Sequence, residues 1–290
     1  MKISVIVTNF NGLKLLKKNL IHVYNNSPEA NQIIVSDDAS TDKSLNYLES
    51  IRIKYPKLKI ISHKKNLGFA ANSNSAVKAS NADLVVLFNN DIRPVKGYIT
   101  NSLKHFKDPL IFGVGFAEVG HENWGKIYWS QGYIQYQPGL DIKTSHISGW
   151  LSGGSSMVRK SLFTKLGGFD KVYQPFYSED LDLSFRAWKS GYKLIWEPLA
   201  KVYHKHEGTM SKFPRRHLEY VKERNRLLTV WRNIQDPKML MQNKLAIISR
   251  CFFGPNYLKI IIAAKKQIKK YPSPMVFPKL TDQQIFNKFK

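Results

Sequence analysis

The sequence predicts an α/β protein built on a mostly parallel central sheet. In the first third of the chain, short apolar runs alternate with segments whose apolar residues recur at helical spacing. Repeated strand–helix–strand units with helices of crossover length give parallel neighbours. Polar residues follow several of these runs directly, at the strand ends beyond which open α/β sheets bind their ligands.

Four strands and three helices are predicted in this part of the chain. The strands cover residues 2–8, 32–36, 58–62 and 84–88. The helices are residues 13–24, a segment carrying Leu45, Leu48 and Ile51 after N-cap residues at 40–42, and residues 70–79. The run at 84–88 is apolar throughout, which is typical of a strand buried on both faces. Pro94 then predicts the start of a helix.

The rest of the chain continues this pattern less regularly. Residues 109–118 predict a strand, and residues 120–146 predict loops or an irregular hairpin because they have no clean period. Gly167 and Gly168 predict a helix end, and Ser178 precedes the next helix. Two further strands are predicted at 192–196 and 200–203, and the second leads into His204 and His206.

The composition limits the class of protein. With 290 residues, of which 43% are apolar, we expect one large domain or a domain with an extension. A single cysteine excludes an intramolecular disulfide. No run of about 18 apolar residues exists, so no membrane-spanning helix is predicted. Met1 leads directly into a strand-like run without a signal peptide, so we expect a cytoplasmic protein.

The net charge of +24 is uneven along the chain. Residues 211–290 contain 18 Lys and Arg against 4 Asp and Glu, giving +14, and the first 210 residues contain 27 against 17, giving +10. Such an excess favours anionic partners. We therefore predict an α/β domain at residues 1–210 and a basic helical extension at residues 211–290.

Three polar strand ends are candidates for one common cleft. They are Thr8 with Asn9, Asp37 with Asp38, and Asn89 with Asp91. A lone carboxylate after a buried strand suits a hard cation that bridges phosphate oxygens, because Mg²⁺ takes only one or two protein carboxylates in such sites. On this stretch alone, Asn89 and Asp91 are equally well interpreted as turn residues.

A second group of candidate residues opens the helix after Ser178. Glu179, Asp180 and Asp182 either stabilise the positive end of the helix dipole, or Glu179 and Asp180 present a general base. The glycine-rich run at 149–159 predicts close backbone approach. Aromatic residues between 124 and 133 suit either stacking on sugars or ordinary packing. Three residues of the glycine-rich run are candidates for contact with a ligand in the cleft: Trp150, Gly153 and Gly154.

In the order of these motifs, the sequence resembles the inverting glycosyltransferases of family 2, which have the nucleotide-sugar-binding GT-A fold. The resemblance covers about residues 1–210, and the branch it resembles most contains rhamnosyltransferases. The motifs that carry it are Thr8-Asn9-Phe10-Asn11-Gly12, Asp37-Asp38-Ala39-Ser40-Thr41-Asp42, Asn66-Leu67-Gly68-Phe69-Ala70-Ala71-Asn72, Asn89-Asn90-Asp91, Gly167-Gly168-Phe169-Asp170, Glu179-Asp180-Leu181-Asp182 and Val202-Tyr203-His204.

The resemblance implies a role for each motif. Asn89-Asn90-Asp91 stands where the family has Asp-x-Asp, so Asp91 is the one carboxylate left for Mg²⁺ or Mn²⁺, and His204 resembles a second metal ligand. Asp180 resembles the catalytic base, with Glu179 as its competitor. Asp38 resembles the acceptor of a hydrogen bond from the pyrimidine ring. The residues expected to bind the donor are Thr8, Asn9, Phe10, Asp38, Asn66, Gly68, Asn72 and Asn90. Those expected on the acceptor side of the cleft are Trp150, Gly153 and Gly154.

The implied reaction is transfer of a single sugar from a nucleoside diphosphate sugar, UDP- or dTDP-linked, to a hydroxyl acceptor with inversion. The transmembrane helices and the Gln-x-x-Arg-Trp motif of the processive synthases are missing from the sequence. A sugar-nucleotidyltransferase is the first alternative, but the Gly-rich loop of those enzymes does not follow the first strand. A nucleic-acid-binding protein is the second, and it is disfavoured because the basic excess lies largely outside the α/β part.

Two helices are predicted in the basic extension, at residues 215–232 and 255–270. The second is amphipathic and basic, and its apolar face either lies on an anionic membrane surface or packs on the core. Acceptors in the resembled family are often lipid-linked saccharides, which favours the membrane. We therefore expect the protein to bind anionic vesicles and to be peripheral on the cytoplasmic face of the membrane.

Overall fold

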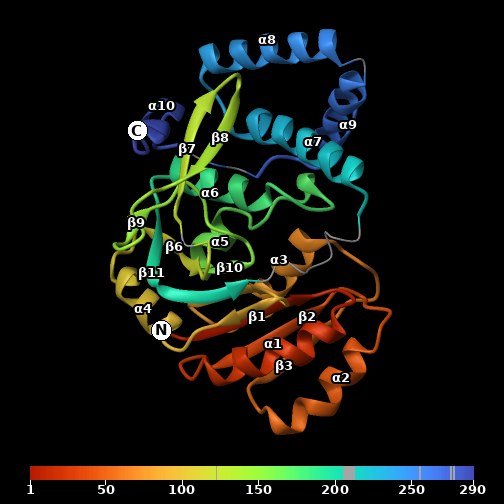
Figure 1. The fold of residues 1–290 in the computed structure, drawn as a ribbon, viewed down its shortest axis with the longest axis vertical. Helices are drawn as coiled ribbons and strands as arrows, with labels where there is room; N and C mark the ends of the chain where they lie inside the picture. Colours follow the sequence, from red (N-terminus) through yellow and green to blue (C-terminus); the bar gives the residue numbers. More distant parts are fainter. Residues whose placement is uncertain (122, 205–212, 255, 275, 277) are drawn as a thin grey trace.

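The computed structural model describes residues 1–121, 123–204, 213–254, 256–274, 276 and 278–290. Its centre is a nine-stranded sheet with the order β3-β2-β1-β4-β10-β6-β11-β5, in which β9 also pairs with β11. Helices lie on both sides of this sheet (Figure 1). The strands of the sheet are β1 (Ile3–Asn9), β2 (Gln32–Asp37), β3 (Leu58–Ser62), β4 (Leu84–Asn89), β5 (Ile92–Pro94), β6 (Ile111–Glu118), β9 (His146–Ile147), β10 (Ser155–Arg159) and β11 (Lys193–His204).

Most strands of the sheet run in one direction, as predicted. β3, β2, β1 and β4 are mutually parallel, β10 is antiparallel to both β4 and β6, and β6 is parallel to β11. Among the described strands of this sheet, only β5, β9 and β10 run the other way. β1 lies between β2 and β4, so the three predicted polar strand ends do lie side by side.

The helices in the first half of the chain follow the predicted pattern, and the second half contains helices that were not predicted. The α-helices are α1 (Leu13–Asn25), α2 (Ser44–Ile51), α3 (Phe69–Ala79), α4 (Tyr98–Leu103), α5 (Lys160–Lys165), α6 (Glu179–Lys189), α7 (Arg215–Asn233), α8 (Pro237–Phe253), α9 (Tyr257–Lys270) and α10 (Asp282–Asn287). Short 3₁₀ turns are η1 (Arg52–Lys54), η2 (Lys104–Lys107) and η3 (Lys171–Tyr173). Helices α8 and α10 have no counterpart among the predicted helices.

The prediction that Pro94 opens a helix is wrong. Pro94 ends the short strand β5, and α4 begins only at Tyr98, after Gly97 with φ +89°. β5 pairs with the last residues of β11, with Ile92 opposite His204. Ile92 is buried, and a proline is tolerated at the end of a short edge strand where no ladder hydrogen bond is needed. This pairing brings the segment after β4 against the end of β11.

The predicted strands at 192–196 and 200–203 are one strand, β11, whose register is irregular between Glu197 and Lys201. Residues 120–146 do contain a hairpin, formed by β7 (Gly125–Ser130) and β8 (Tyr133–Pro138). The hairpin projects from the sheet towards the C-terminal helices (Figure 1). The position of His206 lies outside the described residues.

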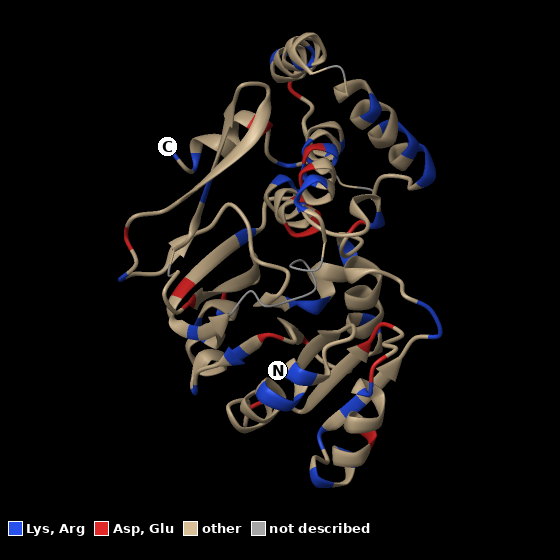
Figure 2. Ribbon diagram, turned by 45° about the vertical axis from the view of Figure 1, so that its right-hand side comes forward, with Lys and Arg blue, Asp and Glu red and all other residues tan. Residues whose placement is uncertain are grey.

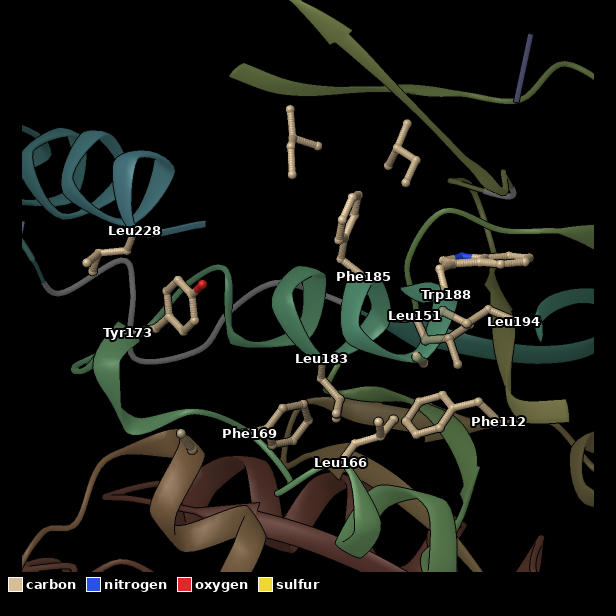
Figure 3. Packing of buried hydrophobic residues seen from close by; sticks show 14 of the residues in the cluster. Phe112, Leu151, Leu166, Phe169, Tyr173, Leu183, Phe185, Trp188, Leu194 and Leu228 are labelled. Carbon is tan, nitrogen blue, oxygen red and sulfur yellow. The ribbon is translucent and has the colours of Figure 1, made fainter. Parts of the chain in front are cut away.

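Alternating residues of the strands face two apolar clusters. Ile6 and Leu87 belong to the cluster on one face, and Val5, Val7 and Val86 belong to the cluster on the other. Because both faces are covered, these strands are apolar without interruption. The first cluster continues through α6 into α7, where Phe185, Leu183 and Leu228 are buried together (Figure 3).

The basic segment at 211–290 shares this cluster with the rest of the chain. Leu227 and Val230 of α7, Ala264 of α9 and Ile285 of α10 are all buried in it. The predicted boundary between residues 210 and 211 lies in a stretch outside the described residues. Among the described helices, none is both long and apolar enough to cross a bilayer.

Candidate active site

One chain of hydrogen bonds fixes the three polar strand ends. Asn9 at the end of β1 donates through Nδ2 to Asp37 at 2.8 Å and accepts at Oδ1 from Asn90 Nδ2 at 2.7 Å. Ser40 donates its N–H and its hydroxyl to Asp37 at 2.8 and 2.7 Å. A Cβ on Gly12 would lie 2.0 Å from Asn90 Nδ2, so only glycine leaves room for this network. Asn9 and Asn90 therefore hold the strand ends together.

Asp38 holds the loop that precedes α3. Its two carboxylate oxygens accept from the backbone N–H groups of Leu67 and Gly68 at 2.8 and 2.9 Å. Burial raises the pKa of Asp38, although these two hydrogen bonds act in the opposite direction. Gly68 has φ +79°, a conformation that favours glycine, and Asn66 Oδ1 also accepts from its N–H at 3.1 Å. The predicted donor-binding residues Asp38, Asn66 and Gly68 thus form one unit.

Three other predicted donor-binding residues lie elsewhere around these strand ends. Asn72 is buried, accepts from Ser36 Oγ at 2.5 Å and donates to Ser36 O at 3.1 Å, so it fastens α3 to β2. Thr8 donates to Phe88 O at 3.4 Å across the β1–β4 pair. Phe10 follows β1 and is half-buried.

Asp91 and His204, the two residues predicted to bind a metal, lie in contact with each other. The β5–β11 pairing places Asp91 Oδ1 3.3 Å from His204 Nε2, and both side chains are buried. Glu118, at the end of β6, lies on the other side of the imidazole, with Oε2 3.1 Å from Nδ1. Sequence reasoning missed Glu118, although it ends a predicted strand as the other polar candidates do.

The two carboxylates beside His204 give its imidazole an unusual pKa. Burial opposes a charge on the imidazole, but Asp91 and Glu118 raise the pKa of His204 to about 9. Apart from its contact with His204, Asp91 Oδ1 is buried and has no hydrogen-bond partner. Within the described residues, no three His, Cys, Asp or Glu side chains form a ready metal cluster. Asp91 and His204 supply one oxygen and one nitrogen ligand, a set that suits Mn²⁺ or Mg²⁺ when phosphate oxygens complete the shell.

The three carboxylates at the start of α6 have different surroundings. Asp182 is buried and bonded to Arg186 Nε at 2.8 Å, Tyr173 at 3.0 Å and Asn233 at 2.8 Å, so it is structural. Asp180 is half-buried and accepts from the N–H groups of Leu181 and Gly153 at 2.8 and 3.3 Å.

Glu179 differs from both, because its buried Oε2 has no hydrogen-bond partner. Burial and the neighbouring Asp180 raise the pKa of Glu179 to about 8, and burial also raises that of Asp180. Tyr177 and Ser178 enter α6 with φ +74° each, a backbone strain of the kind that clusters at functional sites.

The glycine turn before β10 links the two sides of the site. Gly153 binds Asp180 through its N–H, and its Cα faces the rings of Phe69 and Phe169. Gly154 accepts from Asn89 N at 3.1 Å, and a Cβ there would lie 2.4 Å from the Asn89 amide. One tight turn therefore contacts both the general-base candidate and the residue two positions before Asp91.

Trp150, the third residue predicted on the acceptor side, packs edge to face on Tyr136 with ring centres 5.2 Å apart. Of the aromatic residues between 124 and 133, Tyr133 is buried and bonded to Tyr257 at 2.9 Å, and Trp124 stacks on His146. Packing accounts for these two residues, whereas Tyr128 is exposed.

Solved structures of low sequence identity share this fold. GalNAc-T7, solved with UDP, GalNAc and Mn²⁺, has a TM-score of 0.65 at 19% identity, covering 80% of this chain and 48% of that one. TarS of S. aureus, residues 1–349 with UDP-GlcNAc, has a TM-score of 0.61 at 18% identity, covering 94% and 82%. The protein thus has the GT-A fold of nucleotide-sugar-dependent glycosyltransferases.

Sequence comparison gives the family. Residues 4–167 match the model described as glycosyl transferase family 2, and residues 124–253 match that of glycosyl transferase family group 2. The chain belongs to glycosyl transferase family 2. One curated relative is N-acetylglucosaminyl-diphospho-decaprenol L-rhamnosyltransferase of Mycobacterium tuberculosis, 27% identical over 223 residues, which span 64% of this chain and 70% of the relative.

Proposed function

We propose that this glycosyltransferase transfers a single sugar from a UDP- or dTDP-linked donor to a hydroxyl acceptor with inversion of the anomeric centre. The observation that carries the proposal is the pairing of two separate acidic sites. Asp91 and His204 meet at the ends of β4 and β11, and Asp180 is tied through the Gly153 turn to the same end of β4. An inverting displacement needs one site for the leaving diphosphate and a separate site for the acceptor hydroxyl that attacks.

Asp91 and His204 are the residues that would hold the metal. A divalent cation bound there, Mg²⁺ or Mn²⁺, would neutralise charge on the departing diphosphate. To bind it, His204 must lose the proton that Asp91 and Glu118 stabilise. Glu118 is then left to accept from the other imidazole nitrogen, which orients the ring.

Asp180 is the proposed general base. It takes the proton of the acceptor hydroxyl while the acceptor oxygen forms its bond to the anomeric carbon and the bond to the diphosphate breaks. Of the coupled pair, Glu179 is the carboxyl that keeps its proton near neutral pH, because it is buried and beside Asp180. Asp180, with two backbone N–H donors, is the one that ionises more readily.

For the acceptor, we propose a saccharide or lipid-linked saccharide in cell-surface polysaccharide assembly. The Mycobacterium tuberculosis relative is an N-acetylglucosaminyl-diphospho-decaprenol L-rhamnosyltransferase, whose lipid-linked acceptor supports this choice. An acceptor of this kind would bring the enzyme to the cytoplasmic face of the membrane as a peripheral protein.

A donor screen tests the proposal. UDP-, dTDP-, GDP- and CDP-sugars are each mixed with the protein, with Mn²⁺ or with EDTA, and thermal stability and nucleoside diphosphate release are recorded. We expect one pyrimidine donor to raise Tm and to be consumed only with Mn²⁺. Release of pyrophosphate from a nucleoside triphosphate and a sugar phosphate would instead indicate a sugar-nucleotidyltransferase. Tight, salt-sensitive RNA or DNA binding without any donor effect would indicate a nucleic-acid-binding protein.

A further inference from the structure

Helix α8 exposes an apolar ridge at one end of the molecule. We call it the α8 ridge and define it as Met241, Leu245, Ile248, Phe252 and Phe253, with 54%, 59%, 56%, 86% and 91% of their surface exposed. The first four recur at intervals of four, three and four residues, so they form one stripe along the helix. The helix lies at the outer edge of the fold (Figure 1).

The α8 ridge is not the side by which helix α8 packs on the rest of the protein. The opposite side of α8 already packs on the protein, where Met239 is buried and Asn243 donates to Gly132 O at 2.8 Å. Trp231 donates to Asn243 at 3.1 Å, and Ala246 lies against Gly132. Helix α8 is therefore held firmly with its apolar stripe outward.

Helix α9 extends the ridge and adds charge. Tyr257 and Ala264 are buried, so part of the predicted amphipathic face packs on the core, but Leu258 and Ile262 remain 57% and 46% exposed. Together α8 and α9 carry eight Lys and Arg and no Asp or Glu. Figure 2 shows the basic residues of α9 beside α8 at this end of the molecule. Five of the eight are Lys259, Lys265, Lys266, Lys269 and Lys270.

We infer that the α8 ridge is a docking surface for an anionic lipid bilayer, with Phe252 and Phe253 inserted between the headgroups. Exposed apolar side chains on a helix flanked by lysines are the feature that binds such interfaces. Each Lys near an anionic surface adds attraction, which salt weakens. A second copy of this chain fits the ridge poorly, because symmetric pairing would set one cluster of cations against another. The inference rests on the proposed function only in that a lipid-linked acceptor would be located in the bilayer.

Vesicle flotation tests the inference without any sugar donor. The full chain is mixed with vesicles of phosphatidylcholine alone, or with about one third phosphatidylglycerol. We expect binding to the anionic vesicles only, weakened severalfold when salt is raised from about 0.05 to about 0.5 M. The double change Phe252→Ser and Phe253→Ser should lower partitioning by about tenfold or more. The control is Ile53→Ser with Leu140→Ser, at positions 94% and 95% exposed, and it should bind normally.

Three outcomes would overturn the inference. The first is wild-type protein that does not bind anionic vesicles at low salt, and the second is a Phe252/Phe253 variant that binds them as wild type does. The third is wild-type self-association in sedimentation velocity that the same double change abolishes, which would assign the ridge to a second copy. Donor turnover with a soluble acceptor is measured on the same samples. Wild-type protein that turns over the donor but does not bind anionic vesicles would refute the ridge alone. Wild-type protein that binds the vesicles but turns over no donor would refute the proposed function alone.

Discussion

The carboxylates on the two sides of the candidate site differ in the hydrogen bonds that they accept. On the β1–β2 side, Asp37 accepts three hydrogen bonds and Asp38 accepts two, all from groups of the protein. On the β4–α6 side, Glu179 Oε2 is buried without a hydrogen-bond partner, and Asp91 Oδ1 is buried and contacts His204 Nε2 at 3.3 Å. Leaving a buried polar atom without a partner costs about 1–3 kcal/mol. The carboxylates of the first side are thus satisfied within the protein, and the second side is the one to which we assign the chemistry.

The largest effect should follow from removing the metal ligand. Asp91→Ala should abolish detectable turnover, and EDTA should inhibit the wild type, because charge on the departing diphosphate would be left without its counter-ion. The matched control is Asp108→Asn, an exposed carboxylate before the other end of β6, which should keep full activity. Undiminished turnover in EDTA would rule out the metal role.

The next effect concerns the general base. Asp180→Asn should lower kcat by about 10²–10⁴-fold while the donor Kd stays near wild type, because removing a base leaves binding intact. Steady-state kinetics and a donor titration measure both quantities. Near-normal turnover in Asp180→Asn, together with loss in Glu179→Gln, would move the assignment to Glu179.

On the β1–β2 side of the site, replacing an aspartate by asparagine should lower the stability of the folded protein. Asp37→Asn places an amide N–H₂ against the donors of Asn9 and Ser40 and should destabilise the protein by about 2–4 kcal/mol in urea unfolding. Asp180→Asn should leave the unfolding midpoint close to wild type. A stable Asp37→Asn variant would show that the strand-end network does not hold the site.

The smallest effect is the change in stability over a single pH unit. The pKa of Glu179 is about 8 in the folded protein, above its unfolded value of 4.5. Stability from this group is therefore complete below about pH 4.5 and is lost as pH rises towards 8, by up to about 1.4 kcal/mol per pH unit. Glu179→Gln should thus gain stability relative to wild type between pH 5 and 8. Exposed Glu49→Gln serves as the control, and an equal pH profile for Glu179→Gln and wild type would contradict the raised pKa.

The sequence predicts the first side of the site well and the second side less completely. Apolar runs that end in Asn9, Asp37 and Asn90 place those residues at one edge, because parallel strands align their carboxyl ends. The hydrogen bonds among them were not predictable, since they depend on the register between β1, β2 and β4. Thus the motif residues Asn9 and Asn72 turn out to use their amide groups within the protein.

Two features on the second side depend on tertiary packing. Pro94 has the local signal of a helix start, but pairing of Ile92 with β11 makes a strand there and brings Asp91 to His204. Glu118 reaches the imidazole because β6 and β11 are parallel neighbours, a relation that no local pattern encodes. Helix α8 was missed for another reason: its outward stripe and its packed side are both apolar, so its amphipathic period is weak.

The central claim is that Asp91 and His204 hold the cation of the donor diphosphate. Isothermal titration of the nucleoside diphosphate selected by the donor screen, with Mn²⁺ and with EDTA, tests it most directly. We predict that Mn²⁺ tightens binding to the wild type by about tenfold or more, or about 1.4 kcal/mol, and has no such effect on Asp91→Asn. Equal affinity of the wild type with Mn²⁺ and EDTA, or an unchanged Mn²⁺ effect in Asp91→Asn, would contradict the claim.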